Sequence, residues 1–263
     1  MIPQALVLRT AGTNCDGETL HALRTCGAKP DLLHLRELLG EPDRLLRYSI
    51  LVVPGGFSYG DDVAAGKILA NEMKFKLAAQ IRKFVGEKRL VIGICNGFQV
   101  LAKAGLLPGS DVLDFSQTAT LAHNDSGRFQ CEWVGIKNQN SKAKWLKGLP
   151  KSFELPIAHG EGKFVTKDAA SLSRLRSGNQ IAFTYCDPSG NSAGYPVNPN
   201  GSVEDIAGIT DETGQILGLM PHPERFFFFT QCPAWTRLER KSDYGDGAKI
   251  FENGVRYVRE QLL

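Results

Sequence analysis

Residues 89–101 read RLVIGICNGFQVL, and this stretch contains the strongest local signal in the sequence. An apolar strand, Leu90–Ile94, ends at Cys95, and a helix is expected to follow at once over Phe98–Ala104. A glycine is needed on each side because the turn is so sharp that a side chain there would collide with the neighbouring strand and helix. The pattern is the cysteine version of the strand–turn–helix that presents the nucleophile of α/β hydrolases.

Two physical effects favour a chemical role for Cys95. The thiol is expected at the carboxyl edge of the sheet, where open α/β folds bind ligands. It also lies at a helix N-terminus, whose partial positive charge favours thiolate over thiol. The alternative is a small buried residue without chemistry, as most cysteines are. We predict that Cys95 is a nucleophile and keep the alternative for the cysteines that lack such a turn: Cys15, Cys26, Cys131, Cys186 and Cys232.

The chain before this stretch alternates short apolar runs with longer amphipathic ones. Such alternation indicates βαβ crossovers and a parallel sheet covered on both faces by helices. The predicted strands are Ala5–Leu8, Asp31–Leu35 and Ile50–Val53, and the predicted helices are Glu18–Cys26 and a segment from about Ala64 or Asn71 to Val85.

The pattern changes after about Phe115. Short strands alternate with turn-rich stretches, which predicts antiparallel strands added to the same sheet or to a small flanking one. These strands are expected at Arg128–Ile136, Ile181–Tyr185, Ile206–Ile209 and Ile216–Met220, and a last helix is expected over Ala248–Leu263.

One α/β domain over residues 1–263 is the economical interpretation, because the sequence has no internal repeat and no low-complexity linker. Phe226–Gly247 is an atypical excursion before the last helix. It begins with four phenylalanines, Phe226–Phe229. These residues are candidates for docking a partner protein, and the alternative is that at least two of them belong to the core.

A cysteine nucleophile used for acyl transfer needs a base and a third group that orients the base. His222 follows an apolar strand and has a proline on each side. The prolines favour extended backbone, in which residues i and i+2 project on the same side. We therefore predict that Glu224 orients His222; a solvated loop histidine beside a chance glutamate is the alternative.

The segment Val53–Asp62 contains consecutive glycines directly after a predicted strand next to that of Cys95. The backbone N–H groups of Gly55 or Gly56, with the N–H that follows Cys95, can stabilise an oxyanion. Asp61 and Asp62 are interpreted as the N-cap and first-turn charges of the next helix rather than as metal ligands.

A second polar segment, Pro156–Gly162, has the sequence PIAHGEG and is placed between strands. It includes His159, and it is either a substrate- or partner-binding element or only a tight turn. Neither interpretation is favoured by the residues alone.

Composition is that of an ordinary globular protein of 263 residues with a formal net charge of +3. The basic residues form no dense run, so nothing suggests nucleic acid or an anionic membrane as a partner. The N-terminus lacks the features of a signal peptide, and no apolar stretch approaches the length of a membrane span. The cysteines show no metal-ligand spacing. We expect a cytoplasmic protein with reduced thiols and no bound metal.

Together these motifs resemble the triad (class I) glutamine amidotransferases, and most closely the glutaminase subunits of phosphoribosylformylglycinamidine synthases. The Cys turn and the His-x-Glu are generic, whereas FSYGD at 57–61 and HGEG at 159–162 are specific to the purine enzymes. The similarity also includes GTNCD at 12–16 and NPNGS at 198–202. It extends from near Ala5 to about Arg225 and over the last helix.

The resemblance implies a flavodoxin-like fold in which Cys95 is the nucleophile, His222 the base and Glu224 its partner. It implies a glutamine site whose candidate residues are Gly55, Gly56, Asn96, Gln99 and His159.

By the same resemblance, ammonia from glutamine passes to a synthetase subunit, which binds ATP and Mg²⁺, and a small third subunit is a further candidate partner. This chain itself is expected to need no cofactor. The excursion at Phe226–Gly247 departs from the shorter subunits of the family.

Two kinds of alternative remain open at this stage. The first is another enzyme on the same scaffold, such as a cysteine peptidase, a γ-glutamyl hydrolase or an amidotransferase that serves a different synthetase. The second is a non-catalytic interaction subunit, against which the intact set of Cys95, His222 and Glu224 argues.

Overall fold

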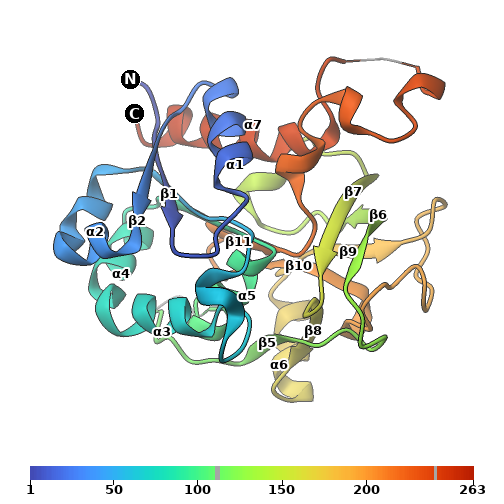
Figure 1. Ribbon diagram of the computed structural model, residues 1–263, viewed down its shortest axis with the longest axis horizontal. Coiled ribbons are helices and arrows are strands. Elements are labelled where there is room, and N and C mark those ends of the chain that lie inside the picture. The colour runs from blue at the N-terminus through green and yellow to red at the C-terminus, as the bar shows by residue number, and fades with distance from the viewer. Residues whose placement is uncertain (110–112, 240–241) are drawn as a thin grey trace.

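A mixed sheet of nine strands forms the centre of the molecule, in the order β2-β1-β3-β4-β11-β10-β9-β6-β7 (Figure 1). The computed structural model describes residues 1–109, 113–239 and 242–263. The nine strands are β1 (Gln4–Arg9), β2 (Lys29–His34), β3 (Ile50–Val53), β4 (Leu90–Ile94), β6 (Gln130–Asn138), β7 (Ser152–His159), β9 (Ile181–Cys186), β10 (Ile206–Thr210) and β11 (Ile216–Leu219). A separate antiparallel pair consists of β5 (Ala119–Ala122) and β8 (Lys163–Thr166).

The half of the sheet that contains β4 is parallel. β2, β1, β3, β4 and β11 pair in parallel, and their order matches the 2-1-3-4-5 arrangement of flavodoxin-like folds. Beyond β11, each of the strands β10, β9, β6 and β7 pairs antiparallel with its neighbour. The predicted fold class, a mostly parallel sheet with antiparallel strands added in the C-terminal half, is confirmed.

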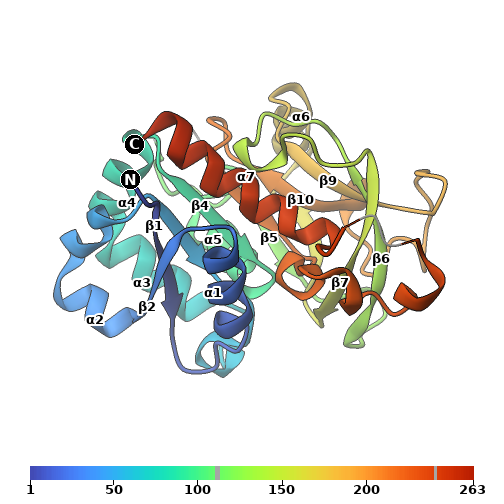
Figure 2. The same ribbon diagram turned by 90° about the horizontal axis from the view of Figure 1, so that it is seen from above.

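Helices cover both faces of the sheet. α1 (Asp16–Thr25) and α7 (Asp246–Gln261) pack together on one face, and α3 (Lys67–Lys76) and α5 (Asn96–Ala104) pack together on the other (Figures 1 and 2). The residues of β3, β4 and β11 are apolar and buried throughout, as expected for parallel strands covered on both sides. Within the described residues, the helices include none that is long and apolar enough to cross a membrane.

Several elements differ from the sequence prediction. The single helix expected to end at Val85 is two helices, α3 and α4 (Ala78–Gly86), because Leu77 leaves helical geometry at φ −121° and ψ 4°. The elements that were not predicted are α2 (Leu35–Gly40), β5, β7, β8 and α6 (Ala169–Ser177). The segment 156–162 does not lie wholly between strands, since Pro156–His159 completes β7.

The excursion at Phe226–Gly247 is irregular apart from short 3₁₀ turns as far as Gly245, and its last two residues already belong to α7. Residues 240–241 within it lie outside the described residues. Phe226 and Phe227 are buried. Phe227 packs edge-to-face on Tyr244 and also contacts Phe251 of α7. The interpretation that at least two of the four phenylalanines belong to the core is therefore confirmed.

Candidate active site

Cys95 lies at the turn between β4 and α5, at the carboxyl end of the parallel strands. Its backbone has φ 51° and ψ −106°, a strained conformation of the kind that clusters at functional sites and costs about 1–3 kcal/mol. A Cβ atom on Gly97 would lie 1.8 Å from the carbonyl oxygen of Val53, and one on Gly93 would lie 2.6 Å from the carbonyl oxygen of Gly97. Both glycines are thus required by close backbone contact, as predicted.

His222 and Glu224 follow β11, which is the neighbour of β4 in the sheet. The His222 backbone is extended, at φ −104° and ψ 90°, and its N–H donates to the Pro156 carbonyl at 2.8 Å. Nδ1 of His222 lies 2.6 Å from Oε1 of Glu224, and both side chains are buried. The predicted pairing of His222 with Glu224 is present in the structure.

The second ring nitrogen of His222 is available to Cys95. Nε2 is buried and has no hydrogen-bond partner among the described residues. Burial alone would lower the pKa of His222, but the charges of Glu224 and Cys95 outweigh it and raise this pKa well above its usual value. The raised pKa therefore favours the protonated form of the imidazole beside Cys95.

Cys15, to which the sequence analysis assigned no role, belongs to the same cluster. Its Sγ is buried 3.9 Å from Nδ1 of His222 and accepts a hydrogen bond from Nη2 of Arg225 at 3.1 Å. Burial raises the pKa of the Cys15 thiol. Potential metal-ligand atoms of Cys15, His222 and Glu224 lie within 4.8 Å of one another. The positive charge of Arg225, whose guanidinium donates to the Cys15 thiol, opposes the binding of a metal cation there. The sequence does contain one signal for this placement of Cys15, because the residue follows β1, which ends at the same edge of the sheet as β4.

Of the two glycines after β3, Gly55 packs against His222 and Gly56 packs against residues 12–14. A Cβ atom on Gly55 would lie 2.9 Å from Cε1 of His222, and Gly56 has φ +136°. The Gly55 carbonyl accepts the N–H groups of Asn14 and Cys15. The N–H of Gly56 donates none of the hydrogen bonds found in the described part of the chain, so it remains open to a ligand.

Asn96 connects the loop after β3 to the start of α5. Its Oδ1 accepts the N–H of Ser58 at 3.2 Å, and its Nδ2 donates to Asp61 at 3.2 Å and to Gln99 at 2.9 Å. Asp61 also accepts the N–H of Gly66, which is the N-cap residue of α3. The expected N-cap role of Asp61 and Asp62 is therefore wrong, because the chain makes a further turn before α3 begins.

A cavity of about 200 Å³ lies over Cys95. Its walls come from the loop after β3, the first turn of α5 and the end of β7. Of the candidate glutamine-site residues, Gly56, Gln99 and His159 line it, whereas Gly55 and Asn96 do not. Phe57 and Phe129 also line this cavity, and their rings stack at 6.5 Å with about half of each side chain exposed.

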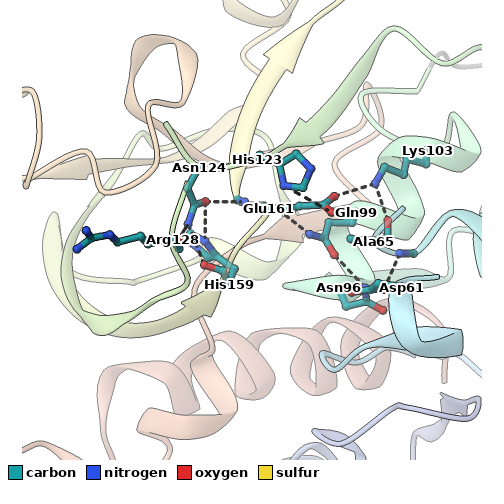
Figure 3. A network of polar contacts seen from close by, with 12 residues as sticks. Asp61, Ala65, Asn96, Gln99, Lys103, His123, Asn124, Arg128, His159 and Glu161 are labelled. Atoms are coloured by element: carbon teal, nitrogen blue, oxygen red, sulfur yellow. Dashed lines mark hydrogen bonds and ion pairs between the residues drawn. The ribbon is translucent and has the colours of Figure 1, made fainter. Parts of the chain in front are cut away.

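His159 is buried at the end of β7. Its Nδ1 lies 3.2 Å from Oδ1 of Asn124, which also accepts the N–H of Gly162 at 3.0 Å (Figure 3). Burial and the nearby charge of His222 lower the pKa of His159 to about 4. This histidine is therefore neutral near pH 7, and hydrogen bonds to Asn124 hold the segment 159–162 in place.

A polar network on one face of α5 joins the walls of the cavity (Figure 3). Gln99 Nε2 donates to the backbone carbonyl of Glu161 at 2.6 Å. Lys103 Nζ donates to the Ala65 carbonyl at 2.6 Å and lies 3.6 Å from Oε2 of Glu161. Burial lowers the pKa of Lys103. The sequence analysis included Glu161 only as part of the segment 156–162, and it did not identify Lys103.

Comparison with known proteins matches the chain to one family over almost its whole length. The model of the CobB/CobQ-like glutamine amidotransferase domain matches residues 2–258. The subunit PurQ of phosphoribosylformylglycinamidine synthase from Dehalococcoides mccartyi is 45% identical over 258 residues, covering 98% of each chain. The subunit PurQ from Methanococcus maripaludis is 42% identical over 273 residues, covering 99% of this chain and 100% of the relative.

A solved structure shows the same relationship. A chain in the structure of PurLQS from Thermotoga maritima is 32% identical and superposes with a TM-score of 0.73. The alignment covers 98% of this chain and 100% of that one.

Proposed function

The chain belongs to the CobB/CobQ-like glutamine amidotransferase domain family, and we propose that it is the glutaminase subunit of a phosphoribosylformylglycinamidine synthase. Relatives of that name are similar to this chain from end to end. The observation that carries the proposal is the hydrogen bond of 2.6 Å between His222 and Glu224 beside the strained turn of Cys95. This is the arrangement that hydrolysis of an amide through a thioester needs.

The reaction proceeds in two halves. The Cys95 thiolate attacks the carbon of the glutamine side-chain amide, and His222 protonates the departing nitrogen, which leaves as ammonia. A water molecule then attacks the γ-glutamyl thioester, and His222 takes its proton. Glutamate leaves, and the thiolate is restored. Glu224 holds the imidazole through Nδ1 and stabilises its protonated form.

Each tetrahedral intermediate carries a negative oxygen that needs hydrogen-bond donors. We propose that the open N–H of Gly56 and the first N–H of α5, at Asn96, donate to this oxygen. Gln99 and His159 border the same cavity and are proposed to contact glutamine. In this proposal Gly55 and Asn96 support the site: Gly55 leaves room for His222, and Asn96 holds the loop.

The ammonia serves a synthetase subunit, which makes phosphoribosylformylglycinamidine in purine biosynthesis. The related chain from Thermotoga maritima comes from a structure of PurLQS, and we propose an analogous assembly with a synthetase and a small third subunit. ATP and Mg²⁺ bind to the synthetase in this proposal. The chain uses only its own side chains for glutamine hydrolysis.

We further propose that residues 1–263 act as one glutamine amidotransferase domain in the cytoplasm. The family match over residues 2–258 supports a single unit. All six cysteines are free thiols, which is usual in a reducing compartment.

Labelling with a diazoketone analogue of glutamine tests the site directly. The purified chain, alone and with its synthetase, is exposed to the analogue with and without excess glutamine and then mapped by mass spectrometry. We expect one adduct, on Cys95, that glutamine prevents. Cys15 is an internal control because it is buried beside the same histidine. An adduct on Cys15, or one that glutamine does not prevent, would contradict the assignment.

A further inference from the structure

Glu161 places a carboxylate in the wall of the catalytic cavity. It lies between Gly160 and Gly162, directly after β7. Its backbone is fixed because its carbonyl oxygen accepts the 2.6 Å hydrogen bond from Gln99. The side chain borders the same cavity as Cys95, and Figure 3 shows it between His123 and Lys103.

The Glu161 carboxylate still has room for a hydrogen-bond donor. The nearest basic side chains are Lys103, with Nζ 3.6 Å from Oε2, and His123, with Nδ1 3.9 Å from Oε1. Both distances exceed the range of about 2.7–3.2 Å for a hydrogen bond. The His123 side chain is 85% exposed, so solvent weakens its contact further.

The two carboxylates in the cavity wall differ in the hydrogen bonds that they already accept. Asp61 and Glu161 both line the cavity, and burial together with the charge of Glu161 raises the pKa of Asp61. Asp61 Oδ1 is already engaged by Gly66 and Asn96. Lys103 offsets one of the two negative charges from behind the wall, and His159 is neutral near pH 7 because its pKa is about 4. In the described part of the chain no donor lies within hydrogen-bond distance of the Glu161 carboxylate, so this lining carboxylate is open to a cationic group of the ligand.

Glutamine carries such a group at the right end. Four bonds of about 1.5 Å each separate its amide carbon from its α-nitrogen, a span of about 5 Å when extended. Glu161 and Cys95 border the same cavity of about 200 Å³, so a single ligand in this cavity can contact both. We propose that Glu161 binds the α-ammonium group of glutamine and thereby selects an α-amino acid over other primary amides. This inference rests on the proposed glutaminase function.

Lys103 is a positioning residue in this scheme. Its ammonium lies between the Glu161 carboxylate and the Ala65 carbonyl, so the acidic group is held at the wall. Two other roles for Glu161 compete with substrate recognition. It could hold the departing ammonium, or it could serve only to stabilise the loop.

The test compares glutamine with glutaramate, the same primary amide without the α-amino group. Ammonia release is measured for wild-type protein, Glu161→Gln, Glu161→Asp and the control Glu132→Gln, each in the complex with its synthetase. Glu132 is an exposed carboxylate on β6, the strand paired with β7. Circular dichroism and the thermal midpoint verify that each variant is folded, and Glu161→Asp provides the test if Glu161→Gln does not fold.

We expect Glu161→Gln to lower kcat/KM for glutamine on the order of 100-fold, mainly through KM, and to leave kcat/KM for glutaramate within about threefold. Glu161→Asp should fall between, because it keeps the charge on a shorter side chain. Glu132→Gln should match the wild type. The preference for glutamine over glutaramate should therefore collapse in Glu161→Gln, shrink in Glu161→Asp and stay at the wild-type level in Glu132→Gln.

Three outcomes would overturn the inference. Equal losses on both substrates would mean that Glu161 acts on the amide, on ammonium or on the fold. An unchanged kcat/KM for glutamine in Glu161→Gln would remove Glu161 from recognition, and so would an undiminished wild-type preference for glutamine in Glu161→Asp at a reduced overall rate. Failure of the proposed function looks different: the wild-type complex would release no ammonia from glutamine at all.

Discussion

Replacing Glu224 with glutamine tests whether the buried carboxylate does more than hold a ring in place. The amide keeps the shape and can still accept the hydrogen bond from Nδ1 of His222, which Oε1 accepts at 2.6 Å in the wild type. It removes the negative charge. Both side chains are buried, so the protonated imidazole loses its main compensating charge in a poorly solvated place.

The magnitude follows from this burial. Removing one charge from a buried pair costs about 3–5 kcal/mol, and each 1.36 kcal/mol corresponds to about a tenfold change in rate. We therefore expect glutamine hydrolysis by Glu224→Gln to slow by about two to four powers of ten. Glu18→Gln is the matched control, because Glu18 pairs with the neighbouring Arg225 but is about one-third exposed. A surface pair of that kind contributes about 0–1 kcal/mol.

The pH profile adds a second, independent readout. Glu224 helps to raise the pKa of His222 well above its usual value, and His222 must carry a proton to protonate the leaving nitrogen. Losing the charge lowers that pKa, so the alkaline limb of kcat should move to lower pH. The assay is ammonia release from glutamine between acidic and alkaline pH in the assembled complex. A Glu224→Gln enzyme within about threefold of the wild-type rate, with an unmoved alkaline limb, would refute the reasoning.

The His222–Glu224 pair also makes the free energy of unfolding depend on pH. The sign of this dependence is opposite to that for a carboxylate whose pKa is lowered in the folded state. The folded-state pKa of His222 is raised, so its contribution is fully present below the unfolded value of about 6.5 and is lost as pH rises through the folded value. Chemical denaturation of wild type and Glu224→Gln at several pH values measures this. The destabilisation by the substitution should shrink as pH rises.

Three further substitutions test the nucleophile, the turn and the buried lysine. Cys95→Ala should abolish glutamine-dependent synthesis and leave ammonia-dependent synthesis by the complex; loss of both in a folded variant would contradict the division of labour. Gly97→Ala places a Cβ 1.8 Å from the carbonyl oxygen of Val53 and should lower the free energy of unfolding by at least about 1–3 kcal/mol. Its control is Gly17→Ala, where a Cβ meets open space, and this substitution should change the free energy of unfolding by less than about 1 kcal/mol. Lys103→Met leaves the Glu161 carboxylate without its buried partner and should cost about 1–3 kcal/mol in urea unfolding; an unchanged midpoint would show that the ammonium contributes nothing.

Local pattern determined much of this protein. A continuous apolar run requires a strand buried on both faces, so β3 and β4 were predicted with the bounds that the structure has. The turn at Cys95 was predicted from the glycines that flank it. The contacts that a Cβ atom would make at Gly93 and Gly97 show why only glycine fits at these positions. The pairing of His222 with Glu224 was also accessible, since two residues apart in extended backbone share a side.

Only the tertiary structure decided which distant residues meet at the site. Cys15 reaches His222 across 207 positions of sequence, and Lys103 reaches Glu161 from another element. Neither contact produces a periodic pattern in the sequence, because each depends on how the sheet places β1, α5 and β7 relative to one another. The N-cap role predicted for Asp61 was wrong for the same reason: the fold places its carboxylate beside the side chain of Asn96 and the N–H of Gly66 instead of at the start of α3. Which partner a polar side chain binds depends on what the fold brings within about 3 Å of it.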